Sequence, residues 1–306
     1  MYFIPQQGNV LENGVSNKTK SKLKPIDAPV YSYWKALYMS FYSTRLYVDV
    51  GKRWRGIGLL YLLLCVAIFS IPFSIRVAIN LNQSFNEQII EPLLLLPTIY
   101  VQNGEISFDR PMPYFVKNKK NQVVLAVDNT GKVAKFSPEY PYMNILITKN
   151  TVYFRIPTPE LFASATPDIN SGVPLSQTFD KGSNFAFNGK KIVEENSIYG
   201  LKYASLALIY PVIVAMFYSI FIVMFLVLAF LGQVFSRIFF SFQVSFKQSC
   251  RLFMVATTPM LLALILILTA DAIFPGFGFI LVIIIAIYFS LGVSSLKAES
   301  KRMVRQ

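Results

Sequence analysis

Four long apolar segments constrain the fold of this chain more than any other feature. A helix needs about 20 apolar residues to cross ~30 Å of hydrocarbon at ~1.5 Å per residue. The last two segments are separated by Ile273–Gly276, whose proline and glycine suit a tight turn. We therefore predict an α-helical polytopic membrane protein with four transmembrane helices, at residues 57–79, 206–231, 252–272 and 277–296.

The excess of basic residues lies on one side of this arrangement. Residues 1–56 carry a net charge of +6, the linker 232–251 carries +3 and the tail 297–306 carries +3, whereas residues 81–200 carry no net charge. The positive-inside rule makes the basic face cytoplasmic. The total charge of +13 has a second interpretation, a nucleic-acid patch, but basic residues beside apolar segments favour membrane orientation. We expect cytoplasmic N and C termini and no nucleic-acid partner.

The chain before the first span has two parts of different character. Residues 1–28 are polar and rich in lysine, which predicts a disordered basic tail. Residues 29–56 contain aromatic side chains at helical spacing, among them Trp34, Tyr38 and Phe41. This pattern predicts an amphipathic helix that lies in the membrane interface. A surface for docking a partner protein is the alternative, and both interpretations stay open.

Residues 80–203, between the first two spans, predict a small antiparallel β domain on the extracytoplasmic side. Hydropathy falls here, and short stretches with a period of two flank turn signals. Four hairpins are expected, with turns at Asn103-Gly104, 128–131, 149–151 and Asn188-Gly189. The second hairpin would return through residues 132–136 and the fourth through residues 190–193.

Two stretches of this domain do not fit the hairpin pattern. Residues 157–183 are rich in Pro, Ser, Asp and Gly, which predicts a long loop. The apolar run 91–97 is too short to cross a bilayer. It either lies on the membrane or joins the core of the domain.

The sequence offers little catalytic chemistry. The absence of histidine removes triad hydrolases, histidine-ligated zinc or haem, and the commonest general acid or base. Cys65 and Cys250 cannot form a disulfide framework. Acids such as Asp109, Asp128 and Glu139 are more typical of turns than of catalysis. We assign no catalytic, cofactor-binding or metal-binding residue and expect neither a cofactor nor enzymatic activity.

Two charges lie near the outer ends of the predicted spans. Arg76 is within a turn of the end of the first span, and Asp271 is at the end of the third, at comparable depth. Since charges in membrane helices are functional candidates by default, we predict an interface ion pair between Arg76 and Asp271. Independent solvation at the interface is the alternative. No ionisable residue is expected at mid-depth, which argues against a proton-coupled transporter or an intramembrane protease.

Several short motifs occur together in a fixed order. They are Ser40–Ser43 before Gly56–Gly58, Val101–Glu105, Leu125–Gly131, and Ser245–Leu252 followed by Thr258-Pro259. In this order and spacing, over about residues 30–295, the chain resembles a bacterial membrane family labelled domain of unknown function 1189. That family is distantly similar to the Yip-type multi-span proteins of membrane trafficking. The resemblance implies a bacterial inner membrane and an outward-facing, periplasmic domain, and it supplies no activity and no site residues.

These features predict a non-enzymatic inner-membrane accessory protein whose extracytoplasmic domain binds an envelope partner or ligand. We expect it to associate with the lipid bilayer and with other membrane or envelope proteins, and its oligomeric state is left open. The alternative is a component of a transport or lipid-handling system, in which proline-kinked helices contact lipid or solute. A stoichiometric protein partner would distinguish the first function, and a bound lipid or solute the second.

Overall fold

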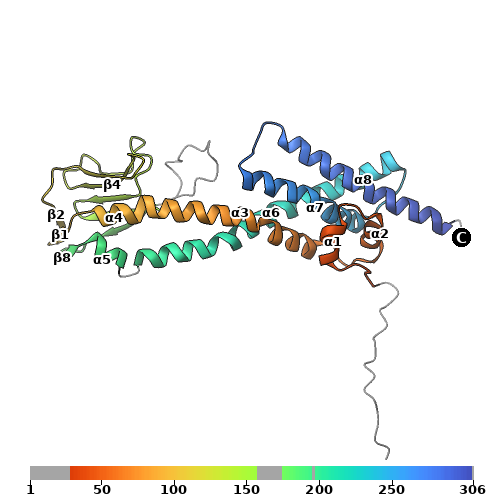
Figure 1. Cartoon of the computed structure of the whole chain (residues 1–306), viewed down its shortest axis with the longest axis horizontal. Helices are drawn as coiled ribbons and strands as arrows, with labels where there is room; N and C mark the ends of the chain where they lie inside the picture. The colour runs from red at the N-terminus through yellow and green to blue at the C-terminus, as the bar shows by residue number, and fades with distance from the viewer. Residues whose placement is uncertain (1–27, 157–173, 195–196, 305–306) are drawn as a thin grey trace, which may run out of the picture.

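The computed structural model describes residues 28–156, 174–194 and 197–304. It contains four helices long and apolar enough to cross a membrane, one at each of the four predicted spans. These helices are α3 (Leu59–Phe85), α6 (Ser197–Phe240), α7 (Phe246–Ala270) and α8 (Phe277–Val304). Figure 1 shows an elongated molecule, with the four helices toward one end and the β domain at the other. The predicted disordered tail lies outside the described residues, except for Ala28.

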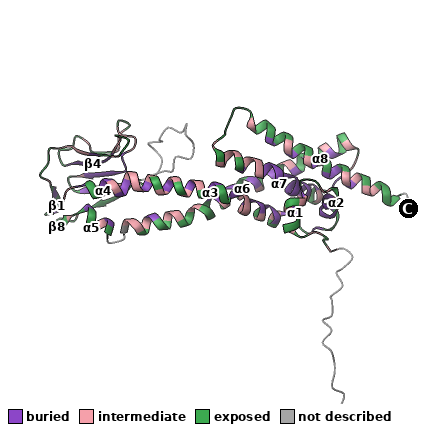
Figure 2. Ribbon diagram, viewed as in Figure 1, coloured by how far each residue is buried: buried purple, intermediate pink, exposed green. Residues whose placement is uncertain are grey.

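Helix α7 is the centre of the helical bundle. Its most apolar stretch is 67% buried, against 28–39% for the other three helices, because α3, α6 and α8 all pack on it. Figure 2 shows exposed residues along the outer faces of α6 and α8. Gly232 of α6 permits a close approach, since an added Cβ would meet the Phe253 ring. Tyr61 Oη and Thr258 Oγ1, 2.7 Å apart, join α3 to α7.

Helices α3 and α6 are longer than their predicted spans. Residues 86–90 form a π-helical turn, η1 (Asn86–Ile90), and the path continues in α4 (Glu91–Leu95). Beyond the α7–α8 turn this path runs beside the first part of α6 (Figure 1). We call residues 77–95 and 197–205 the stalk. At ~1.5 Å per residue, residues 77–95 extend about 28 Å beyond the four-helix region. Within the stalk, the buried Lys202 donates to Asn86 Oδ1 at 2.8 Å.

The region predicted as one interfacial helix contains two short helices instead, α1 (Tyr33–Met39) and α2 (Thr44–Arg53). A new helix begins because the Ser43 side chain accepts a hydrogen bond from the Leu46 N–H and caps α2. Helix α2 packs against α7 and α8, with Leu46 and Val50 fully buried. It is therefore a part of the bundle, whereas α1 keeps exposed aromatic residues, Trp34 and Tyr38.

The β domain holds two small sheets. The first has the order β2-β1-β8, and the second has the order β3-β4-β5-β6-β7. Their strands are β1 (Ile99–Gln102), β2 (Glu105–Ser107), β3 (Tyr114–Lys117), β4 (Val123–Asp128), β5 (Ile145–Thr148), β6 (Thr151–Phe154), β7 (Leu175–Thr178) and β8 (Phe185–Phe187). The predicted hairpins at Asn103-Gly104 and at residues 149–151 are present as β1–β2 and β5–β6.

The other two predicted hairpins are wrong. Strand β4 pairs antiparallel with β3 and parallel with β5, so residues 132–136 are not a strand and belong to a crossover. This crossover lays Val133 and Phe136 over the sheet against Leu146. Strand β8 pairs with β1, and residues 189–194 form the helix α5 (Gly189–Glu194) rather than a returning strand. The predicted antiparallel domain therefore contains one parallel pair.

The predicted long loop and the apolar run 91–97 also have definite places. Residues 157–173 of the loop lie outside the described residues, and β7 follows them. In the apolar run, Pro92, Leu93 and Leu96 are buried, and the two leucines pack in the core of the β domain. Helix α5 lies directly against this run, since a Cβ on Gly189 would meet the Leu93 carbonyl. The run thus fixes the β domain to the stalk.

Candidate functional site

Arg76 and Asp271 lie together at the end of the bundle where the stalk begins. Arg76 Nη2 is 3.1 Å from Asp271 Oδ2, and both side chains are about three-quarters buried, with exposed fractions of 22% and 28%. Arg76 Nη1 also donates to the carbonyls of Leu268 and Thr269, at 2.7 and 3.0 Å. Since Arg76 is 17 residues past the start of α3, it lies about 26 Å along that helix, near the far side of a ~30 Å hydrocarbon layer.

The Arg76 side chain completes the C-terminus of α7. The last carbonyls of a helix have no partner within the helix, and they carry the negative end of its dipole. Asp271 is the C-cap residue, in a left-handed conformation with φ of 55°, so its carboxylate adds to the same negative site. One guanidinium satisfies all three groups, which joins α3 to α7 where the stalk begins. The arrangement positions helices and contains no reacting group.

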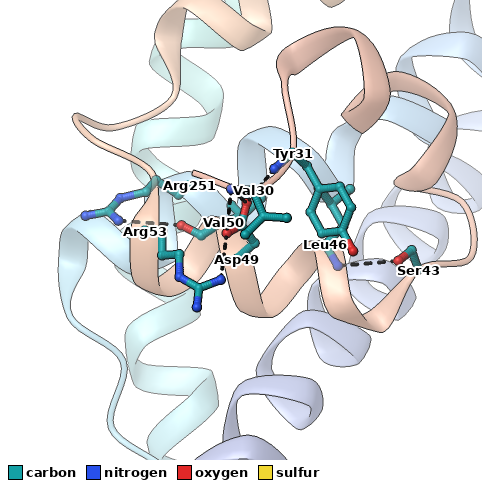
Figure 3. A network of polar contacts seen from close by, with 8 residues as sticks. All are labelled: Val30, Tyr31, Ser43, Leu46, Asp49, Val50, Arg53 and Arg251. Carbon is teal, nitrogen blue, oxygen red and sulfur yellow. Dashed lines mark hydrogen bonds and ion pairs between the residues drawn. The ribbon is translucent and has the colours of Figure 1, made fainter. Parts of the chain in front are cut away.

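A second polar cluster lies at the opposite end of the bundle, around the buried Asp49 of α2 (Figure 3). Its carboxylate accepts from the backbone N–H groups of Val30 and Tyr31 at 3.1 Å. It also lies 3.4 Å from Arg53 Nη1, one turn further along α2. These contacts hold the segment that precedes α1 against α2. Asp49 is the only acidic residue between positions 28 and 56, the one sequence signal that points to it.

Arg251 connects this cluster to α7. Its Nη1 lies 3.5 Å from the carbonyls of Val50 and Gly51, at the last turn of α2. Figure 3 shows the Arg53 and Arg251 side chains on the same side of α2. The C-terminal end of α2 therefore faces a cation from a neighbouring helix, as its dipole favours.

A groove on the β domain is large enough to hold a segment of a partner. It has a volume of about 660 Å³ and is lined by β6, β7, the following loop and β8. Strands β7 and β8 each form the edge of their sheet, and all four residues of β7 are exposed. Four phenylalanines line the groove: Phe154, Phe179, Phe185 and Phe187. Among the residues that the structure describes, the groove thus combines an apolar surface with strand edges that no other strand pairs with, the two features that bind an extended peptide.

The loop that closes the groove is tied down by backbone hydrogen bonds. The Phe179 N–H donates to the Asn150 carbonyl at 2.8 Å, and the Gly104 N–H donates to the Ser183 carbonyl at 3.1 Å. Gly104 has a φ of 79° and a Cβ there would lie 2.6 Å from the Asp180 carbonyl oxygen, so only glycine fits. The groove is therefore a preformed feature of the two sheets.

The Asp128 carboxylate of the β domain acts in a turn. Asp128 accepts from Thr130 N and Oγ1 and from Val133 N at 2.6–2.9 Å, which fixes the start of the β4–β5 crossover. Burial alone would raise the pKa of Asp128, but these hydrogen bonds outweigh it and hold the pKa below its usual range. Within residues 28–156, 174–194 and 197–304, no group of three or more cysteine or acidic side chains could hold a metal ion.

Four apolar helices and a β domain inserted after the first of them define a multi-pass membrane protein. Its membrane part is a helical bundle, and one small domain lies outside the bundle. Within this class the chain belongs to the DUF1189 family, described as "Protein of unknown function (DUF1189)", whose profile matches residues 34–293. No curated protein and no solved structure matches the chain.

Proposed function

We propose that this chain is a non-enzymatic accessory protein of a bacterial inner membrane, and that its β domain binds an envelope partner. The observation that carries the proposal is the groove between β7 and β8, held beyond the bundle by the stalk. An open strand edge offers main-chain hydrogen bonds, and the phenylalanine lining offers apolar contacts. The preferred partner is an extended, apolar segment of another protein.

The orientation rests on the distribution of charge. Basic residues gather at the end of the bundle opposite the β domain, in α2, at the facing ends of α6 and α7 (Arg237 and Lys247) and in the last turns of α8. The positive-inside rule assigns that end to the cytoplasm and the β domain to the periplasm. In this orientation both termini are cytoplasmic, and the stalk crosses the outer headgroup region.

Cysteine labelling tests the orientation. Both native cysteines are buried, so the parent protein gives little background with a membrane-impermeant maleimide. In spheroplasts, Lys117→Cys on the β domain should react at once, and Lys301→Cys near the end of α8 only after the membrane is opened. The reverse pattern would overturn the topology.

Site-specific photo-crosslinking tests the binding function. A photoreactive residue in place of Gln177, on the exposed edge strand β7, should capture one defined protein in living cells. The matched control is the same residue at Lys117, on β3, the opposite edge of the same sheet. Phe185→Asp in the groove should abolish capture at 177. Capture that is equal at both edges, or that survives Phe185→Asp, would refute a groove-bound partner.

A further inference from the structure

A pocket opens beside the first turn of α3, at the basic end of the bundle. Its volume is about 480 Å³, within the range of small-molecule sites. One wall is the segment 29–33, which leads into α1, and the other walls come from Lys35, Trp54 and Arg55. The hydrogen bonds of Asp49 to Val30 and Tyr31 hold the first wall in place. The pocket is thus formed by the same contacts that attach the N-terminal segment to the bundle.

An aromatic cluster indicates the level of the pocket in the membrane. The Trp54 ring packs between Tyr33 and Tyr61, with centroid distances of 4.8 and 5.4 Å. Tyr61 is the third residue of α3, so the pocket lies level with the beginning of a membrane span. Trp34 of α1 has an exposed fraction of 65% beside it. Tryptophan and tyrosine favour the headgroup region, because their rings are apolar and their N–H and O–H groups are polar.

The pocket has unused donors and a positive charge. Trp54 is 3% exposed, and its indole Nε1 has no hydrogen-bond partner among the described residues. A buried donor without a partner is costly, and a bound acceptor would remove that cost. Lys35 and Arg55 both line the pocket, and neither forms an ion pair with any acid in the described part of the chain. Lys35 and Arg55 therefore place two cations on one pocket, and Trp54 forms part of its wall.

The nearest carboxylate that contacts the pocket wall does not cancel this charge. Asp49 lies behind Val30 and Tyr31, where two backbone N–H groups and the Arg53 guanidinium already compensate it. Lys35 and Arg55 consequently determine the charge at the opening of the pocket. These two cations favour an anion over a cation.

We propose that this pocket binds the phosphate of an anionic glycerophospholipid from the adjacent membrane leaflet. The Arg55 guanidinium can bind two phosphate oxygens at once, and the Lys35 ammonium adds a point charge. The acyl chains would follow the outer surface of α3 from its first turn, where Leu60 is 68% exposed. A soluble phosphate shares the headgroup chemistry but has no such apolar contact, so depth in the bilayer selects the lipid.

The test measures lipid retained by the full-length protein. The protein is reconstituted in phosphatidylcholine nanodiscs with a minor fraction of phosphatidylglycerol, extracted into mild detergent, and analysed by native mass spectrometry. Lys35→Ala/Arg55→Ala should retain about tenfold less phosphatidylglycerol than the parent. The matched control, Lys301→Ala/Arg302→Ala, removes the same charge from the exposed last turns of α8 and should retain as much as the parent.

Further arms separate the pocket from a general charge effect and from a soluble anion. Trp54→Phe keeps a ring but removes the indole N–H, and should lower retention by less than the double variant. Equal losses in the pocket and control variants, or undiminished retention in the pocket variant, would overturn the proposal. Displacement of the lipid by inorganic phosphate would assign the pocket to a soluble anion instead. Failure here leaves the groove proposal unaffected, because the two sites lie at opposite ends of the molecule (Figure 1).

Discussion

Replacing Asp49 by alanine tests how the N-terminal segment is attached to the bundle. The substitution removes the carboxylate that binds the N–H groups of Val30 and Tyr31. A hydrogen bond to a charged group contributes about 1.5–3 kcal/mol. Val30 is 54% exposed, so water can replace part of this stabilisation. We therefore take the lower value, about 1.5 kcal/mol, for each of the hydrogen bonds from Val30 and Tyr31. The Arg53 pair adds at most ~0.5 kcal/mol, since that side chain is 45% exposed. The free energy of unfolding should fall by about 3 kcal/mol.

Tryptophan fluorescence measures this change where it occurs. The chain has two tryptophans, Trp34 and Trp54, and both lie at this end of the bundle. Urea titration in mild detergent should show the red shift of the buried Trp54 at lower urea in Asp49→Ala than in the parent. Glu299→Ala, which removes one acid from the last turns of α8, serves as the control. A loss below ~0.5 kcal/mol, the range of ordinary surface substitutions, would refute the assigned role of the carboxylate.

Three further predictions address the bundle and the β domain. Gly232→Ala should lower the free energy of unfolding by about 1–3 kcal/mol in thermal melts, because the methyl group meets Phe253, whereas Gly200→Ala on the same helix enters open space and should not. Arg76→Ala should destabilise by about 3 kcal/mol, and adding Asp271→Asn should restore about 1 kcal/mol, since the Leu268 and Thr269 carbonyls still lack the guanidinium. Full restoration would contradict the carbonyl contacts. Folding lowers the pKa of Asp128, so the stabilisation from its carboxylate is present above the unfolded-state pKa of about 3.9 and is lost as the pH falls through the folded-state pKa. Circular dichroism should therefore show that the stability of Asp128→Asn depends less on pH in this acid range than the stability of the parent.

Local signals made parts of the fold predictable from the sequence. A run of about 20 apolar residues has one stable solution in a bilayer, so each span could be placed. Asn103-Gly104 specifies a tight turn through its own backbone preferences, and the β1–β2 hairpin follows. The contact between Arg76 and Asp271 could be anticipated from matching depth in two spans.

The remaining features depend on non-local contacts that leave no pattern in the sequence. The parallel pairing of β4 with β5 is made across a crossover, and the pairing of β8 with β1 joins residues more than eighty positions apart. No sequence pattern reveals the role of Asp49, because its two partners in the segment before α1 are backbone N–H groups, which every residue except proline has. Mean hydropathy does not reveal the stalk, because most of residues 80–91 are polar, although they remain helical and bury Leu81, Phe85 and Ile89 on one face. Hydropathy detects burial in lipid and says nothing about a helix that continues into water.

Because the helical path from α3 into α4 is uninterrupted, the number of residues in it sets the orientation of the β domain. Each residue in a helix advances the axis by ~1.5 Å and rotates it by about 100°, so the stalk sets the direction in which the β domain faces as well as its height. Removing one residue from residues 77–85 would turn the groove by more than a quarter of a revolution relative to the spans. The paired segment of α6 would oppose that rotation through contacts such as the one between Lys202 and Asn86. A partner that binds both the groove and the spans would thus be sensitive to the helical phase of the stalk.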